Sequence, residues 1–277
     1  MAPETVEDLE RALFGAFPEQ DAESWDNVGL AVGDRMAPLG KVALNLDMSV
    51  EAVIAAHVSG CNVLVTHHPP FIADAPSEFG PAAQTFAPAP GRVIYEAASR
   101  GVNLINMHTN ADRAIATRVK FAHMLEINCV GNCESVLDKT RELLDTGFGA
   151  LLECGDAGPI ELGALASKCK RVFGGSPRVW GDAKRRIQHI AYLNGSWRDA
   201  DLYEKCMRAG IECVIVGETG YHLCLDAQPY LSIIELGHDL SELPIVDVLY
   251  DALVHAELDE TKIVRLHCSD ANWWPAE

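Results

Sequence analysis

The chain has 277 residues, 48% of them hydrophobic, which is enough for the cores of about two globular domains. Its formal net charge of -18 argues against sequence-independent binding to nucleic acid, because that charge repels phosphate groups. The nine cysteines lack regular spacing, the N-terminus lacks signal-peptide features and no apolar stretch reaches the ~18 residues of a membrane span, so we expect a reduced, cytoplasmic protein without membrane contact.

The first predicted element is a helix over residues 5–17, where apolar residues recur at helical spacing. Thr5 is a candidate N-cap, and Pro18 ends the segment. The following Trp25-Asp26-Asn27 lies in a predicted loop with two possible roles, an Asx turn or a wall of a ligand pocket.

A strand, a helix and a second strand are predicted next. Residues 41–47 alternate apolar side chains as a strand does, and Ser49 can cap the helix that follows. Gly60 can close that helix before an apolar strand at residues 61–66. A connection of this kind predicts that the two strands are parallel.

Two adjacent histidines, His67 and His68, leave the second strand just before two prolines. They are expected at the carboxyl end of a strand, where α/β proteins bind ligands. Imidazole is the commonest metal ligand, although neutral histidines in a loop also satisfy themselves by ordinary hydrogen bonds. Residues 69–90 are rich in proline and are predicted to form a long loop, which could be a lid over the site.

The next part of the chain repeats this arrangement, with a helix near 91–100, a strand at 102–107 and a helix at about 111–126. His108 follows the strand, and Asp112 lies four residues later. A separation of four places two side chains on one face of a helical turn, where they can hold one ion or form a solvated pair.

Residues 127–147 interrupt the periodicity, and we place a change of domain there. The region beyond is again predicted to be α/β, with strands at 148–153, 177–181, 187–193 and 211–216 and helices near 160–172 and 199–209. Its candidate functional residues are Glu218 and His222, which we expect to contact a substrate or the metal ligands.

A third cluster follows a predicted strand at residues 231–236, where His238 and Glu242 open a long helix and are again four residues apart. If these residues share metal ions with His67 and Asp112, this part of the chain must fold back onto the first domain. The middle region is then an insertion.

The predicted fold is therefore α/β, with two α/β domains and a dinuclear metal site at strand carboxyl ends near the domain cleft. Residues 1–126 together with 231–277 form the predicted metal-binding domain, and residues 127–230 form the second domain.

The motifs resemble those of the NGG-interacting-factor-three-like family, whose members are also called GTP cyclohydrolase I type 2 homologues. The matching stretches, in family order, are Ser24-Trp25-Asp26-Asn27-Val28-Gly29-Leu30, Thr66-His67-His68-Pro69, His108-Thr109-Asn110-Ala111-Asp112, Gly217-Glu218-Thr219 and Gly237-His238-Asp239-Leu240-Ser241-Glu242. Each is weakly specific alone, and together they are highly specific.

The resemblance implies a dinuclear metal centre held by His67, His68, Asp112, His238 and Glu242. It also implies a position close to the metals for His108, and a ring-like homohexamer.

The chain departs from the family pattern at Thr219-Gly220-Tyr221-His222, where a basic residue and two histidines are more frequent, and at Leu193-Asn194-Gly195-Ser196-Trp197, where the family turn is richer in glycine. Neither departure removes an implied ligand, but both concern positions at which relatives could contact a substrate.

Three histidines and two carboxylates suit two divalent ions of zinc, iron, manganese or cobalt better than calcium or magnesium, which prefer oxygen. The first functional hypothesis is a metal-dependent hydrolase of a small nucleotide-like or heterocyclic substrate, with His108 and Glu218 as candidate catalytic residues. The sequence contains no phosphate-cradling glycine loop that would independently support GTP as that substrate. The alternative is a non-catalytic metal-binding protein that recruits partners.

Overall fold

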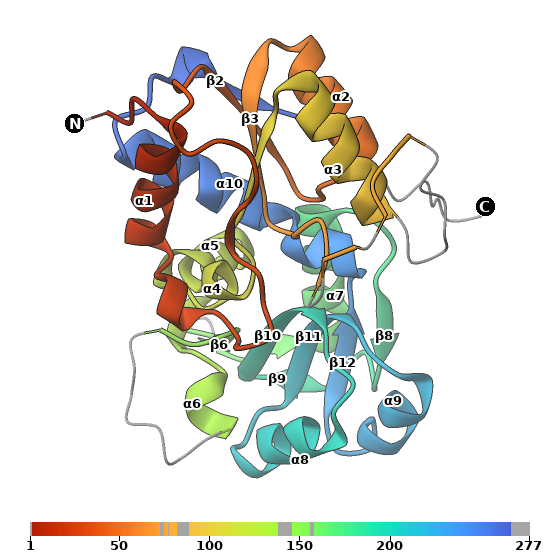
Figure 1. Cartoon of the computed structure of the whole chain (residues 1–277). Coiled ribbons are helices and arrows are strands. Elements are labelled where there is room, and N and C mark those ends of the chain that lie inside the picture. The colour runs from red at the N-terminus through yellow and green to blue at the C-terminus, as the bar shows by residue number, and fades with distance from the viewer. Residues whose placement is uncertain are drawn as a thin grey trace. The chain divides into compact units, whose positions relative to one another are not determined.

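The structure is a computed structural model that describes residues 2–72, 75–76, 78–81, 89–137, 146–155 and 158–266. It has a mixed α/β fold with two compact units (Figure 1). The first unit comprises the described residues up to Ala111 and from Ile245 onward, and the second runs from Asp112 to Pro244. The predicted domain boundaries near residues 126 and 230 stay a prediction.

The first unit is built on a five-stranded sheet with the strand order β1-β4-β3-β2-β13. The strands are β1 (Gly29–Val32), β2 (Lys41–Asn45), β3 (Cys61–Thr66), β4 (Asn103–Asn106) and β13 (Ile263–Arg265). All neighbours are parallel except β1, which is antiparallel to β4. The predicted parallel pairing of β2 with β3 is confirmed. The C-terminal part of the chain also returns to the first sheet, because β13 pairs with β2.

Helices cover both faces of this sheet (Figure 1). They are α1 (Val6–Ala16), α2 (Val50–Val58) and α3 (Ala89–Arg100), with 3-10 turns η1 (Glu19–Asp21) and η2 (Glu260–Lys262). The predicted caps are confirmed, because the Thr5 and Ser49 side chains accept hydrogen bonds from the amides of Asp8 and Ala52. One buried core lies between α2, α3 and the sheet face that carries Ala43, Leu64 and Leu104.

The second unit contains a six-stranded sheet with the order β5-β6-β10-β11-β12-β8. Its strands are β5 (Asn128–Gly131), β6 (Ala150–Glu153), β8 (Arg178–Trp180), β10 (His189–Ser196), β11 (Cys213–Glu218) and β12 (Ser232–Glu235), and a separate small sheet pairs β7 (Ile160–Glu161) with β9 (Arg186–Ile187). The central strands β10, β11 and β12 are parallel to one another, so their carboxyl ends lie at one edge.

In the described part of the second unit, five helices lie wholly within the unit: α5 (Ile115–Leu125), α6 (Glu134–Leu137), α7 (Leu162–Phe173), α8 (Ala200–Arg208) and α9 (Tyr221–Ala227). Helices α8 and α9 pack on one face of the sheet around Tyr203, Cys206 and Cys224. Aromatic side chains of α5 and α7 pack against Tyr192 of β10, whose ring centroid is 4.2 Å from that of Phe121 and 5.6 Å from that of Phe173.

Two helices contain the boundaries between the units, namely α4 (Thr109–Asp112) and α10 (His238–His255). The single helix predicted over residues 111–126 is wrong, because α4 and α5 are separate and Ala114 between them has extended backbone. The predicted lid at residues 69–90 lies partly outside the described residues and stays a prediction. Within the described residues we find no helix that is both long enough and apolar enough to cross a membrane.

Candidate metal centre

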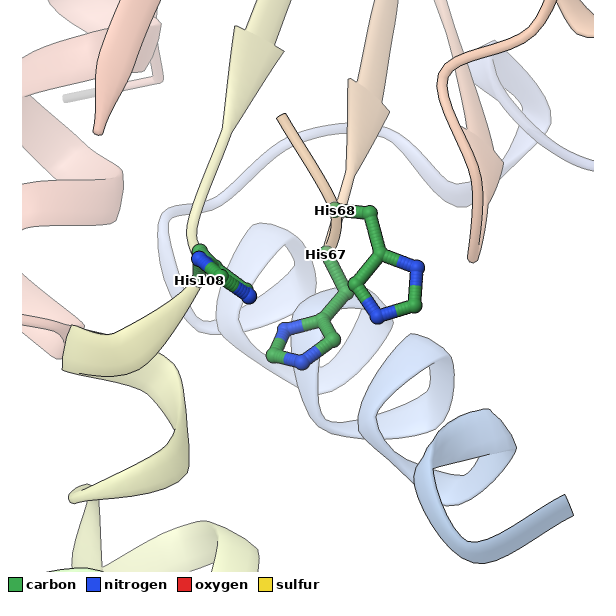
Figure 2. A group of neighbouring side chains, drawn as sticks. All are labelled: His67, His68 and His108. Carbon is green, nitrogen blue, oxygen red and sulfur yellow. The ribbon is translucent and has the colours of Figure 1, made fainter. Parts of the chain in front are cut away.

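Three histidines of the first unit gather where two neighbouring parallel strands end (Figure 2). His67 and His68 follow β3, and His108 follows β4. One ring nitrogen from each lies within 4.8 Å of the others. The ring centroid of His67 is 5.0 Å from that of His68 and 5.2 Å from that of His108. The parallel strands thus bring together side chains that are up to 41 residues apart in sequence.

Each of these imidazoles is held through its Nδ1 atom by an oxygen acceptor. Nδ1 of His67 lies 2.9 Å from the carbonyl oxygen of Met107, and Nδ1 of His68 lies 2.6 Å from a carboxylate oxygen of Asp47. Nδ1 of His108 lies 3.0 Å from a carboxylate oxygen of Asp26. Since carbonyl and ionised carboxyl oxygens only accept hydrogen bonds, Nδ1 carries a proton in each ring, whether that ring is neutral or charged. In the neutral form the lone pair is then on Nε2, as a metal ligand requires.

The carboxylate of Asp26 is fully buried beside His108. It accepts hydrogen bonds from the backbone amide and hydroxyl of Thr109 as well as from His108. Burial raises the pKa of Asp26, but the hydrogen bond and positive charge of His108 and the two bonds from Thr109 outweigh burial and lower the pKa to about 2. The Trp25 ring also lies edge-on to His108, 6.1 Å away. The loop therefore holds His108 in place, and its role as a wall of a ligand pocket stays a prediction.

In the second unit, an amide connects two carboxylates that the sequence analysis singled out. The side-chain amide of Asn194 donates to Asp112 at 2.6 Å and to Glu242 at 3.4 Å. Glu242 and Asn194 are 4% and 6% exposed. On the first turn of α10, Nε2 of His238 lies 3.1 Å from a carboxylate oxygen of Glu242. The spacing of four between His238 and Glu242 thus produces the predicted pair.

Close packing at the end of β10 fixes the position of Glu242. Gly195 has φ +72°, and a Cβ atom added there would lie 2.4 Å from a carboxylate oxygen of Glu242. The Gly195 amide donates to the Ser241 hydroxyl at 2.9 Å, and that hydroxyl donates to the carbonyl of His238 at 2.7 Å. Gly217 at the end of β11 is equally confined, since an added Cβ would lie 2.5 Å from the same hydroxyl. The glycines therefore allow the helix to approach the strand ends.

Glu218 lies at the end of β11 and pairs with groups other than His222. Its carboxylate is 3.6 Å from Nδ1 of His238 and 3.4 Å from the guanidinium of Arg198. His238 thus lies between the carboxylates of Glu218 and Glu242. His222 is exposed on α9, where its ring lies edge-on to Tyr221.

Both groups of side chains have the chemistry of a metal site. The first unit supplies three imidazoles whose Nδ1 atoms are all engaged by oxygen acceptors, and the second supplies two carboxylates and an imidazole. Imidazole nitrogens, and imidazole nitrogens together with carboxylate oxygens, are each donor types that suit borderline divalent ions. The residues present therefore fit the metals that the sequence motifs implied.

The sequence analysis missed two residues that hold the candidate ligands, Asp47 and Asn194. Asp47 follows β2 and Asn194 lies near the end of β10, so each is at the strand edge where ligands were sought. A search of every strand end for polar residues would have found them. Their partners could not have been assigned, because those partners are 21 and 82 residues away in the chain.

Comparison with known proteins agrees with this fold. The family model described as Duf34/NIF3 (NGG1p interacting factor 3) matches residues 4–272. A relative from Clostridium acetobutylicum named "GTP cyclohydrolase 1 type 2 homolog" is 30% identical over 248 residues, which cover 88% of this chain and 87% of the relative.

Two solved structures have a similar fold. A hypothetical protein from Staphylococcus aureus has a TM-score of 0.82 at 20% identity, covering 99% of this chain and 100% of its own. A Bacillus cereus protein related to NIF3 has a TM-score of 0.79 at 16% identity, covering 100% of both chains. At these identities the structures bear on the fold alone.

Proposed function

Because this chain belongs to the Duf34/NIF3 family, we propose that it is a metal-dependent hydrolase of a small nucleotide-like or heterocyclic substrate. The observation that carries the proposal is the group of three histidines whose Nδ1 atoms are all held by oxygen acceptors. Acceptors of this kind orient metal-binding imidazoles and raise their basicity.

The proposed ligands are His67, His68, Asp112, His238 and Glu242, holding two divalent ions. Five side chains exceed the four that one tetrahedral ion needs. When bound, two such ions act as Lewis acids and lower the pKa of water towards about 7, the chemistry that hydrolysis at neutral pH requires. Shared between two ions, five side chains would leave coordination positions open, whereas in a closed structural site protein ligands fill every position.

Within this proposal, His108 transfers a proton and Glu218 orients the ring of His238. Asp26 holds Nδ1 of His108, so the proton that His108 can take up or release is the one on Nε2. Glu218 faces Nδ1 of His238 and restrains that ring. The substrate class follows the name of the Clostridium relative, so GTP is one compound to test and not the assigned substrate.

The test is a screen of nucleotides and heterocycles, with product detection by mass spectrometry, using protein loaded in turn with zinc, iron, manganese or cobalt. We expect turnover that requires metal and falls by at least ~100-fold in Asp112→Asn, since a ligand is lost. His57→Ala, which changes an exposed histidine of α2, is the matched control and should keep full activity. Tightly bound metal without turnover of any compound would favour the non-catalytic alternative.

A further inference from the structure

The buried side chain of Asn194, near the end of β10, has two carboxylates as its hydrogen-bond acceptors. Its nitrogen lies 2.6 Å from a carboxylate oxygen of Asp112 and 3.4 Å from one of Glu242. The orientation of the amide follows from these neighbours, because ionised carboxylates accept hydrogen bonds and cannot donate them. Its two N–H groups are therefore divided between the two carboxylates.

The backbone around Asn194 is irregular, and this irregularity sets the direction of the side chain. The pairing of β10 with β11 shifts register between Leu193 and Ser196, as in a β-bulge, and irregularities of this kind redirect side chains. The carbonyl of Asn194 accepts a hydrogen bond of 2.6 Å from the indole of Trp197. The following Gly195 has φ +72° and lies against Glu242. The strand end is thus held on both sides of the asparagine.

Asn194 differs from the groups that bind two other glutamates of this unit. Glu134 and Glu235 are each bound by two nitrogens of an arginine, which supplies a full positive charge. Asn194 donates hydrogen bonds to Asp112 and Glu242 but adds no charge. The amide can therefore orient both carboxylates without supplying a positive charge of its own, and His238 also lies 3.1 Å from Glu242.

We propose that Asn194 is a positioning residue that holds the carboxylates of Asp112 and Glu242 side by side for metal binding. The metal part of this inference rests on the proposed function. The pairing of the two carboxylates through Asn194 is a property of the metal-free chain as well.

The first measurement is metal titration of Asn194→Ala and Asn194→Leu, the second of which keeps the branching and the number of side-chain heavy atoms but removes the donor. Both variants should lose metal affinity by about 10- to 100-fold, the usual effect of removing a group that orients a ligand. Asn103→Ala is the matched control, because Asn103 is also a buried strand asparagine but donates to the carbonyl of Asn62. It should lower stability and leave metal affinity unchanged.

The second measurement is a double-mutant cycle on the metal-free protein, combining Asn194→Ala with Glu242→Gln and with Asp112→Asn. We expect each pair to be coupled by about threefold or more in the unfolding equilibrium constant, because contacting residues are not additive. If the wild type binds metal and both Asn194 variants match it, Asn194 is not a positioning residue, although the proposed function stands. If the wild type binds no metal, the proposed function fails, and the double-mutant cycle alone tests whether Asn194 pairs the two carboxylates. Additive changes in stability would then show that it does not, and coupled changes would show that it does.

Discussion

Among single residues, the carboxylates that accept hydrogen bonds from the histidines give a direct test of the candidate centre. Asp47 holds Nδ1 of His68 at 2.6 Å and is itself part-exposed. Replacing it by alanine should leave the fold intact but lower metal affinity by about 10- to 100-fold, because the imidazole loses its orientation. Isothermal titration with metal measures this effect in Asp47→Ala, with Asp34→Ala as the control. Asp34 is a loop acid whose carboxylate accepts a hydrogen bond from the backbone amide of Met36. Equal affinities in the two variants would contradict the role of Asp47.

Another residue-scale prediction concerns acid stability and Glu235. Burial raises the pKa of Glu235, but hydrogen bonds from Arg178 and Trp180, the charge of Arg178 and the amide of Thr219 outweigh burial and leave the pKa below its ordinary value of 4.5. A lowered pKa contributes stability that is present above pH 4.5 and is lost as the pH falls through the folded value.

Glu235→Gln should therefore be less stable than the wild type by about 1.5 to 3 kcal/mol at pH 7, the usual contribution of hydrogen bonds to a charged group. The difference should narrow as the pH falls below 4.5. Urea unfolding at several pH values measures it. A difference independent of pH would mean that the Glu235 charge does not contribute.

The sequence indicated which residues of the centre carry its chemistry, but not what holds them. His67, His68 and His108 could be placed because each directly follows an apolar strand. Asp26 could be seen only as a loop residue, since its bond to His108 spans 82 positions and depends on the packing of that loop. Local sequence patterns predict where strands end, but they do not predict hydrogen bonds between residues that are far apart in the chain.

At the scale of elements, the junction of β10 with α10 can be tested through its glycine. Gly195→Ala adds a Cβ only 2.4 Å from a carboxylate oxygen of Glu242 and places alanine at φ +72°. Gly210→Ala is the matched control, because Gly210 also has positive φ, +82°, but open space around it. Urea unfolding should show Gly195→Ala to be less stable than the control by about 1 to 3 kcal/mol, the cost of overpacking. Equal losses would mean that only backbone strain matters there.

Long elements with clear periodicity were predicted well, and short or irregular ones were missed. The predicted helix at residues 160–172 corresponds to α7, and the predicted strand at 211–216 corresponds to β11. No strand was predicted at β1, whose four residues begin with Gly29 and are followed by Gly33. Strand β13 has three residues, and its membership of the first sheet depends on pairing with a strand more than 200 residues earlier. Periodicity cannot report such distant pairings.

At the scale of the whole molecule, we propose the homohexamer that the motif resemblance implies. Size-exclusion chromatography with light scattering at micromolar concentration should give about six times the 30.1 kDa mass of one chain. A monomer under these conditions would contradict this assembly. That result would not bear on the proposed metal ligands.

Metal content is the best single test of the proposal that this chain binds two divalent ions through its histidines and carboxylates. The measurement is elemental analysis of gently purified protein, repeated after chelation and reloading. The wild type and His57→Ala should hold two ions per chain. Glu242→Gln should hold fewer, because a glutamate carboxylate can meet two ions while an imidazole meets one. No metal in the wild type, even after reloading, would contradict the claim, and two tightly bound ions in Glu242→Gln would exclude Glu242 as the bridging ligand.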